Sequence, residues 1–404
     1  MSLTGTARPI GLQCPMAGFS CDGRENTDLK VDCDFPGGNI ILERIEGNNV
    51  FVRQDQRGSR DWFYWYFRVL GCKGRDLTFH FHEDWAIGVR GPALSLDGGK
   101  TWFWLGKESR GKASFRFAPG EDEARFCFTI PYLEANLREF LGRHRRNPRL
   151  EVGALARTRK GRTAELLRLG RLDGRCDHRV MLACRHHCCE TMAGYALEGI
   201  MDAVLEESED GGWFRERAEI AVVPFVDKDG VEDGDQGKNR APHDHGRDYG
   251  VNCIHPEVRA IREFIPAWAK AKLRLVMDMH CPWVSGNYNE HVYFVGADDA
   301  RNWKELGLFS RILESVRQGP IPYQAANNLP FGKEWNTAEE QAGGLKSLHA
   351  WCLERPEVAF SCSLELPYAN AEGMCVTAES ARGFGRDLAK AIRRYLEERG
   401  PTGA

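Results

Sequence analysis

The chain has 404 residues, of which 42% are hydrophobic and 28% are charged, and its formal net charge is −3. A chain of this length is expected to bury two hydrophobic cores rather than a single small one. The nearly balanced charge excludes a global basic field of the kind that attracts nucleic acids or membrane surfaces, so we expect neither as a partner.

The N-terminal residues, the apolar stretches and the cysteines of the chain bear on the cellular compartment of the protein. The N-terminal residues Met-Ser-Leu-Thr-Gly-Thr-Ala-Arg-Pro-Ile lack the apolar run of a signal peptide. No later stretch reaches the roughly 18 consecutive apolar residues that a membrane-spanning helix needs. The 14 cysteines are scattered from Cys14 to Cys375, and a chain that buries a large core does not need disulfides. We therefore expect a cytoplasmic protein with free thiols.

The N-terminal third of the chain is predicted to consist of strands. Short segments rich in β-branched and aromatic residues are separated by Gly, Asp and Pro, at 50–52, 62–70, 77–81, 102–105, 115–117 and 125–130. Strands that follow one another without helices predict an antiparallel β-sandwich or barrel. A connecting helix is predicted at 131–149, so we assign residues 1–150 to an N-terminal β-sandwich domain.

After residue 150 the pattern changes to strands that alternate with helices. Strands are predicted at 179–183, 219–224, 273–277 and 358–364, and helices at 191–205 and 255–270. This alternation predicts an α/β domain with a mixed, largely parallel sheet over residues 151–404. The polar segment 229–250 is long for a connection, and such loops are usually functional or disordered.

Four residues are candidates for the chemistry of this second domain. His187 and Glu190 lie three residues apart where a predicted strand gives way to a helix, so that an imidazole and a carboxylate can bind one ion. His280 directly follows a second apolar strand, and Glu365 interrupts a third. Taken singly, His280 is better explained as a core histidine and Glu365 as a salt-bridged core carboxylate.

The positions of the four residues favour a shared site. Ligand-binding residues of an open α/β sheet gather beyond the carboxyl ends of its strands, and all four residues lie near predicted strand ends. Two histidines and one glutamate with an open fourth position are typical of a catalytic zinc site. Glu365, outside that ligand set, is then the natural general base for the attacking water.

These segments resemble the zinc carboxypeptidases of the M14 family. Arg185-His186-His187-Cys188-Cys189-Glu190 matches the family's R-x-H-x-x-E segment, and Asp278-Met279-His280 matches the segment of its third ligand. The whole chain, from about Asp34 to Glu365, is similar to the cytosolic carboxypeptidase branch, which joins a β-sandwich to the peptidase domain. The resemblance implies one Zn²⁺ ion per chain, bound by His187, Glu190 and His280, with Glu365 as the catalytic glutamate.

The family motif D-x-N-R falls on Asp244-His245-Gly246-Arg247. The resemblance implies that Asp244 orients His187 and that Arg247 holds the terminal carboxylate of the substrate by a bidentate pair. Gly246 replaces the usual Asn and removes a hydrogen-bond donor. Arg240 lies in the same loop and is a candidate for a second cation. A surface ion pair with a nearby aspartate remains the other interpretation of Arg247.

The predicted function is removal of the C-terminal residue of peptides or proteins, and the branch resemblance adds an acidic residue as a candidate for the one removed. Two alternatives stay open. One is a zinc amidase or deacylase that needs no free C-terminus, which Gly246 favours. The other is a binding protein whose peptidase domain is secondary. The sequence does not determine the oligomeric state or the physiological substrate.

Overall fold

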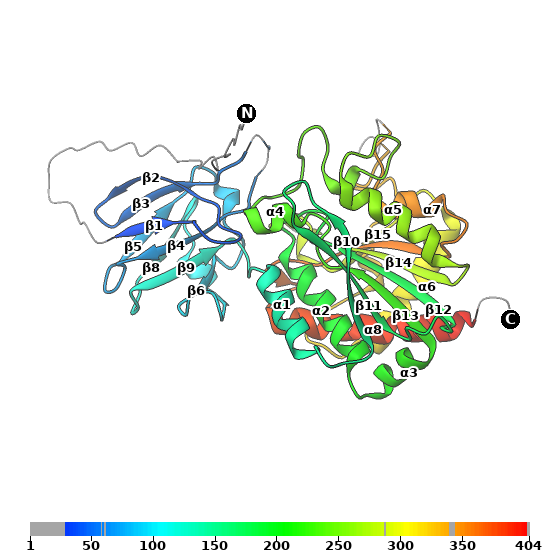
Figure 1. Cartoon of the computed structure of the whole chain (residues 1–404). Coiled ribbons are helices and arrows are strands. Elements are labelled where there is room, and N and C mark those ends of the chain that lie inside the picture. The colour runs from blue at the N-terminus through cyan, green and yellow to red at the C-terminus, as the bar shows by residue number, and fades with distance from the viewer. Residues whose placement is uncertain (1–28, 58, 60–61, 287, 339–343, 402–404) are drawn as a thin grey trace, which may run out of the picture.

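The computed structural model describes residues 29–57, 59, 62–286, 288–338 and 344–401. Residues 1–10, on which the expectation about export rests, lie outside this described part. Strands and helices form two blocks joined by α1 (Glu134–Arg143), an all-strand block and a larger block that contains most of the helices (Figure 1). None of the helices in the described ranges is long and apolar enough to cross a lipid bilayer.

The first block consists of two sheets. One has the strand order β1-β4-β9-β6-β7 and the other β2-β3-β5-β8. The strands are β1 (Lys30–Asp32), β2 (Ile41–Glu46), β3 (Asn49–Arg53), β4 (Tyr66–Leu70), β5 (Leu77–His80), β6 (Ala93–Ser95), β7 (Phe103–Trp104), β8 (Ser114–Phe117) and β9 (Glu123–Cys127). Two short 3₁₀ helices, Asp84–Ala86 and Lys107–Ser109, lie between them.

The prediction of an antiparallel block is wrong for one strand pair. All pairings in the two sheets are antiparallel except that of β3 with β5, which is parallel. The reason is topological: β4, which lies between these strands in the chain, belongs to the other sheet. The chain crosses to that sheet and back, and therefore enters β5 in the direction of β3.

Aromatic side chains fill this block. Trp65 and Phe67 of the β4 region are alternate residues and face the same way, as the two-residue period of a strand requires. The Phe67 ring lies 5.5 Å from that of Phe79 and 5.6 Å from that of Phe126. Phe63 points to the second block and contacts Trp283 there, at 4.8 Å between ring centroids. One hydrophobic core therefore runs through both blocks, and the division at residue 150 remains a prediction.

The second block is built on a seven-stranded sheet of order β10-β11-β13-β12-β14-β16-β15. Its strands are β10 (Leu150–Arg157), β11 (Thr163–Gly170), β12 (His178–Cys184), β13 (Ala218–Val223), β14 (Leu273–His280), β15 (Tyr293–Val295) and β16 (Ser361–Glu365). The four central strands are mutually parallel, whereas β10, β11 and β15 pair antiparallel. The sheet is thus mixed, as predicted, and its parallel part is the centre.

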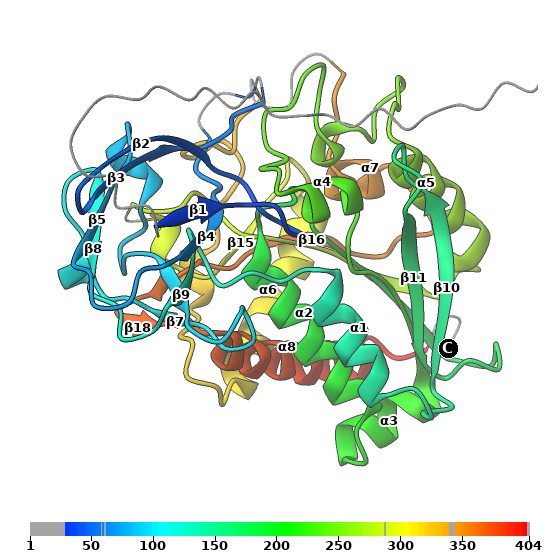
Figure 2. The same ribbon diagram turned by 60° about the vertical axis from the view of Figure 1, so that its left-hand side comes forward.

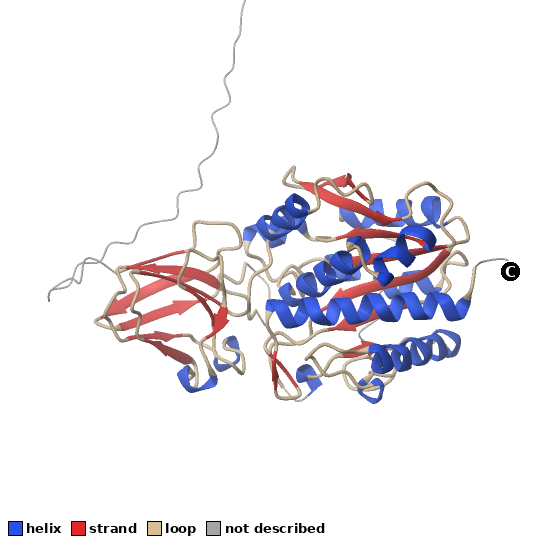
Figure 3. Ribbon diagram, turned by 90° about the horizontal axis from the view of Figure 1, so that it is seen from below, coloured by secondary structure: helices blue, strands red, loops and turns tan. Residues whose placement is uncertain are grey.

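Helices cover both faces of this sheet (Figures 2 and 3). They are α2 (Thr191–Leu205), α3 (Glu209–Arg217), α4 (Lys228–Asp233), α5 (Pro256–Ala269), α6 (Ala300–Val316), α7 (Leu348–Leu353) and α8 (Ala378–Arg399). Val180 and Leu182 of β12 belong to the core beneath α2 and α8, whereas Met181 and Ala183 belong to the core beneath α5 and α7. Because alternate residues point to opposite faces and both faces are covered, this central strand is apolar from Val180 to Cys184.

The remaining elements are short. They are the hairpin of β17 (Asn370–Ala371) and β18 (Met374–Cys375) and the 3₁₀ helices His245–Arg247, Tyr288–Glu290 and Ala325–Asn327. The cysteines of the described residues are free thiols. The carboxyl ends of β12, β14 and β16 meet at one edge of the sheet, and the candidate site lies there.

Candidate metal centre and active-site cavity

A tight turn after β12 presents the first two candidate ligands. The backbone of Arg185 adopts a left-handed conformation with φ of 62°, which turns the chain sharply at the strand end. The buried Arg185 guanidinium donates to the carbonyl of Tyr132 at 2.7 Å and to that of Cys188 at 3.0 Å. These bonds fix the turn on which His187 and Glu190 lie, immediately before α2.

The third candidate ligand comes from the neighbouring strand. His280 is the last residue of β14, and its register partner on β16 is Glu365. The Nδ1 atoms of His187 and His280 lie 2.9 and 2.8 Å from the two carboxylate oxygens of Glu190. One potential ligand atom from each of the three residues lies within 4.8 Å of the others. The structure therefore brings together the three residues that the sequence predicted.

The second nitrogen of each imidazole faces another carboxylate. His187 Nε2 lies 3.5 Å from Asp244, and His280 Nε2 lies 2.9 Å from Asp278. Carboxylates in this position fix the ring and increase the basicity of a metal-binding histidine. Asp244 was predicted for this role and Asp278 was not. The signal was present, because residues two apart on a strand share a face.

The charges at this site fit a divalent cation. Glu190 is fully buried, and burial opposes its ionisation. Lys238, His187 and His280 nevertheless hold the pKa of the Glu190 carboxyl well below its usual range. The Lys238 ammonium lies 2.8 Å from Glu190. Positive charge is thus drawn to the space among these donors, and two imidazoles with one carboxylate are a donor set that transition metals prefer.

His187 and Glu190 line a cavity of about 420 Å³, and His280 lines a smaller cavity beside it. The lining residues of the larger cavity are His187, Glu190, Lys238, Asn239, Asp244, Arg247, Pro282, Trp283, Asn289, Tyr293, Trp335 and Glu365. The smaller cavity, of about 100 Å³, shares Glu365 and Arg247 and continues between Gly246, Gly296 and His349. Lys238, Trp283, Tyr293 and Trp335 were not identified from the sequence, because they come from loops and a short strand whose positions depend on the fold.

Glu365 has the surroundings of a proton acceptor. Its side chain is buried, and burial raises the pKa of its carboxyl to about 7. The Oε2 atom has no hydrogen-bond partner among the described residues. A buried carboxylate with an unused oxygen beside a cavity is poised to accept a proton from a molecule in that cavity.

The loop that carries Asp244 and Arg247 packs closely on His187. A Cβ atom at Gly246 would lie 2.8 Å from His187 Nε2 and 3.2 Å from Asp244 Oδ1, so this loop conformation requires glycine. Arg247 lines both cavities.

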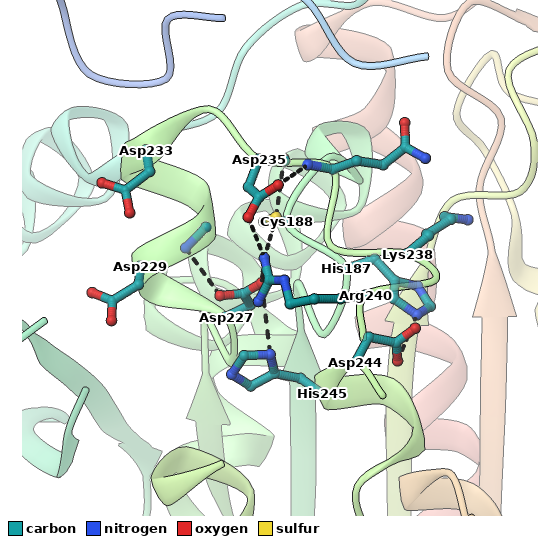
Figure 4. A network of polar contacts seen from close by, with 12 residues as sticks. His187, Cys188, Asp227, Asp229, Asp233, Asp235, Lys238, Arg240, Asp244 and His245 are labelled. Carbon is teal, nitrogen blue, oxygen red and sulfur yellow. Dashed lines mark hydrogen bonds and ion pairs between the residues drawn. The ribbon is translucent and has the colours of Figure 1, made fainter. Parts of the chain in front are cut away.

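Arg240 does not lie at the cavity, where it was predicted to supply a second cation for the substrate. It is not among the residues that line either cavity. Instead, its guanidinium forms ion pairs with Asp227 at 2.9 Å and Asp235 at 2.6 Å (Figure 4). Two buried or half-buried carboxylates hold it away from the cavity, and the second cation at the cavity is Lys238.

Comparisons with known proteins support this reading of the fold. The crystal structure of a metallo-carboxypeptidase from Burkholderia cenocepacia superposes with a TM-score of 0.78 at 20% identity, covering 92% of this chain and all of that chain. An uncharacterized protein of Zymomonas mobilis is 24% identical over 385 residues, which are 92% of this chain and 97% of that protein. Mouse cytosolic carboxypeptidase 2 is 26% identical over 351 residues, or 76% of this chain and 40% of that protein. No family model matches the chain.

The fold is that of the metallo-carboxypeptidases, and the site contains a group of residues that could hold a metal ion. In sequence the chain is similar to the cytosolic carboxypeptidases, at 24% to 26% identity. The chain matches only two fifths of the length of mouse cytosolic carboxypeptidase 2.

Proposed function

We propose that the chain is a zinc-dependent carboxypeptidase in which His187, Glu190 and His280 bind one Zn²⁺ ion and Glu365 is the general base. The observation that supports it most is the placement of these four side chains. Three potential ligand atoms lie within 4.8 Å of one another, and Glu365 lines the same cavity with an oxygen that has no partner among the described residues.

Each of these groups has a different role in the proposed reaction. Zinc, when bound, supplies Lewis-acid polarisation of the scissile carbonyl and makes the attacking water more acidic. Glu365 accepts the proton of that water and delivers it to the leaving amine. Asp244 and Asp278 hold the rings of His187 and His280 so that their Nδ1 atoms face Glu190.

Substrate binding is assigned to the two cations of the cavity. Arg247 is proposed to hold the terminal carboxylate by a bidentate pair, and Lys238 adds positive charge on the same wall. Two cations in one cavity favour an anionic substrate, which supports the proposed preference for an acidic C-terminal residue. Equal turnover of peptides that end in Glu and in Gln would exclude that preference.

The Glu365→Gln variant tests the assignment of the base. Gln has nearly the same shape but cannot accept a proton, so we expect kcat to fall by about 100-fold or more while zinc content stays normal. Glu379→Gln, an exposed position at the start of α8, is the matched control and should leave kcat unchanged. Undiminished turnover by a zinc-loaded Glu365→Gln protein would overturn the proposal.

A second candidate function is a zinc amidase or deacylase. The observation that favours it is Gly246, which lacks the side chain that assists the family's carboxylate-binding arginine. Comparing hydrolysis of a peptide with a free C-terminus and the same peptide as its C-terminal amide separates the two functions. A carboxypeptidase should strongly prefer the free acid, whereas comparable rates would favour the amidase. A protein that only binds partners should contain no stoichiometric zinc.

We also propose a cytosolic location. The names of the cytosolic carboxypeptidases that match the chain support it. Cell fractionation with a full-length protein checks this, and recovery mainly outside the cytosol would contradict it.

A further inference from the structure

A second group of potential metal ligands lies away from the catalytic residues. It consists of His245, His255 and Glu257, of which one potential ligand atom each lies within 4.8 Å of the others. All three side chains are buried, with 4%, 3% and 2% of their surface exposed. His245 lies on the loop of residues 234–247 that also carries Asp244 and Arg247, which we call the catalytic loop. The other two residues lie at the start of α5. Nothing in the proposed hydrolytic mechanism uses this group.

The loop turns His245 away from the catalytic centre. Figure 4 shows His245 facing Asp227, whereas its chain neighbour Asp244 points to His187. The two groups share no residue, although Asp244, which faces His187, is the chain neighbour of His245.

Several polar atoms of the second group lack the partners that burial demands. Glu257 Oε2 and His245 Nδ1 are buried and have no hydrogen-bond partner among the described residues. His245 Nε2 lies 3.5 Å from Glu257 Oε2, which is longer than a good hydrogen bond. Two ligands bound tetrahedrally at about 2.0 Å to one zinc ion are roughly 3.3 Å apart. The distance of 3.5 Å between His245 Nε2 and Glu257 Oε2 fits two ligands of one metal ion better than it fits a hydrogen-bonded pair.

The histidines also have the support that metal-bound imidazoles require. His245 Nδ1 faces Asp227 Oδ2 at 3.6 Å, and His255 donates from Nε2 to the carbonyl of His243 at 3.2 Å. His255 Nε2 is thus occupied by an oxygen acceptor, and His245 Nδ1 faces a carboxylate beyond hydrogen-bond distance, which leaves the other nitrogen of each ring for an ion. The two rings are stacked, with centroids 3.6 Å apart.

A purely structural role explains less of this arrangement. Glu257 lies in the first turn of α5, where the helix dipole favours a carboxylate. That accounts for a negative charge at this position. It does not account for a buried oxygen without a hydrogen bond that lies beside two imidazoles, because such a group costs free energy.

We propose that His245, His255 and Glu257 form a second zinc site, structural rather than catalytic. The ion would connect the catalytic loop to the first turn of α5 and so fasten the segment on which Asp244 and Arg247 lie. Two Zn²⁺ ions per chain follow, one at each group.

Metal analysis of purified full-length variants tests this inference. Wild-type protein that has been stripped with a chelator, reloaded with Zn²⁺ and desalted should contain two equivalents of zinc. Glu257→Gln should contain one and keep the catalytic ion, and His280→Ala should contain one and keep the structural ion. Glu263→Gln, an exposed position on the same helix, is the control and should contain two. No loss of zinc in Glu257→Gln relative to the wild type would overturn the inference, whereas no loss in His280→Ala would count against the catalytic site alone.

Thermal unfolding gives a readout that does not depend on activity or on the folding of Glu257→Gln. In the His280→Ala variant, which lacks a catalytic ligand, Zn²⁺ should still raise Tm by several degrees through the second site. Mg²⁺ at the same concentration should not, because imidazole ligands do not suit it. The absence of any zinc-dependent Tm shift in this variant would also overturn the inference, whatever the outcome for the catalytic site.

Discussion

Gly246 shows how closely the metal-binding histidine is enclosed. Its missing side chain leaves just enough room for the His187 ring, because a Cβ there would lie 2.8 Å from Nε2. His187 cannot move freely, since its other nitrogen faces Glu190 at 2.9 Å. We therefore expect Gly246 to influence metal binding at His187 as well as the position of Arg247.

The Gly246→Ala variant tests this. The added methyl group should displace His187 from Asp244, and we expect the affinity for Zn²⁺ at the catalytic site to fall about 10- to 100-fold. Competition with a chromophoric chelator measures it. Gly120→Ala, where a Cβ would meet nothing within 4 Å, should bind zinc like the wild type. Unchanged affinity in Gly246→Ala would show that the loop adjusts without cost.

His178, the first residue of β12, makes stability depend on pH. Burial, with a contribution from the charge of Arg274, lowers the pKa of its ring to about 4, below the value of about 6.5 expected in the unfolded chain. The unfolded state therefore takes up a proton first as the pH falls. Stability is complete above pH 6.5 and is lost between about pH 6.5 and 4.

Urea unfolding at pH 7 and pH 4.5 measures this effect. The wild type should lose on the order of 1 to 3 kcal/mol more than His178→Gln over this range. His82→Gln, at an exposed site, should behave like the wild type. Identical pH dependence in the wild type and His178→Gln would refute the assignment to this ring.

At the residue scale, much of the candidate site was predictable and some was not. His187, Glu190, His280 and Glu365 could be found because strand ends are visible in the apolar pattern and converge in an α/β sheet. Arg240 could not be placed, because its partner Asp227 lies 13 positions earlier in the chain and is brought close only by the fold. Lys238 was missed for the same reason.

At the scale of elements, α2 and α8 cross unusually closely. A Cβ on Gly199 of α2 would lie 2.0 Å from the carbonyl oxygen of Arg382, and one on Gly385 of α8 would lie 2.0 Å from that of Ala196. Because each glycine lacks a side chain, the backbone of the other helix can approach it closely. The contact places α2, which begins directly after Glu190, firmly on α8.

Substituting either glycine should separate the helices. We expect Gly199→Ala and Gly385→Ala each to lower the free energy of unfolding by about 1 to 3 kcal/mol or more, because backbone atoms must move to admit the methyl group. Gly142→Ala in α1, where a Cβ has open space, should instead be neutral or stabilising by about 0.5 to 1 kcal/mol. Denaturant unfolding measures all three, and a stabilised Gly385→Ala would contradict the close crossing.

The same glycines explain one gap in the sequence analysis. Helices α2 and α5 were predicted, but α8 was not, because Gly383 and Gly385 interrupt its run of helix-forming residues. β10 was missed because most of its residues are exposed, so it lacks the alternation of a half-buried strand. The parallel pairing of β3 with β5 arises because the chain passes through the other sheet between them. The local sequence pattern of a strand does not predict such a crossing.

At the scale of the whole molecule, the two blocks meet at the catalytic loop. The side-chain oxygen of Gln236 accepts hydrogen bonds from the backbone N–H groups of Phe63 and Tyr64, at 2.5 and 3.1 Å. Asn39 donates to the carbonyl of Gly234 at 2.8 Å. The all-strand block thus anchors the loop just before Lys238.

Removing the Gln236 side chain should affect stability and catalysis together. Gln236→Ala leaves two buried N–H groups without this acceptor, and we expect a loss of about 1 to 3 kcal/mol in the free energy of unfolding. We also expect a lower kcat/KM, because Lys238 loses its nearby anchor. Gln324→Ala, at an exposed position, is the control for both measurements. Wild-type kcat/KM in Gln236→Ala would show that the loop holds its shape without the other block.

Trp283 extends this connection to the mouth of the cavity. It lines the cavity and packs against Phe63 at 4.8 Å and Trp85 at 6.1 Å between ring centroids. Changes at Phe63 or Trp85 therefore reshape the entrance without touching a metal ligand or Glu365. Under the proposed function, we expect substitutions in the all-strand block to change which substrates are accepted while the metal ligands and Glu365 stay constant.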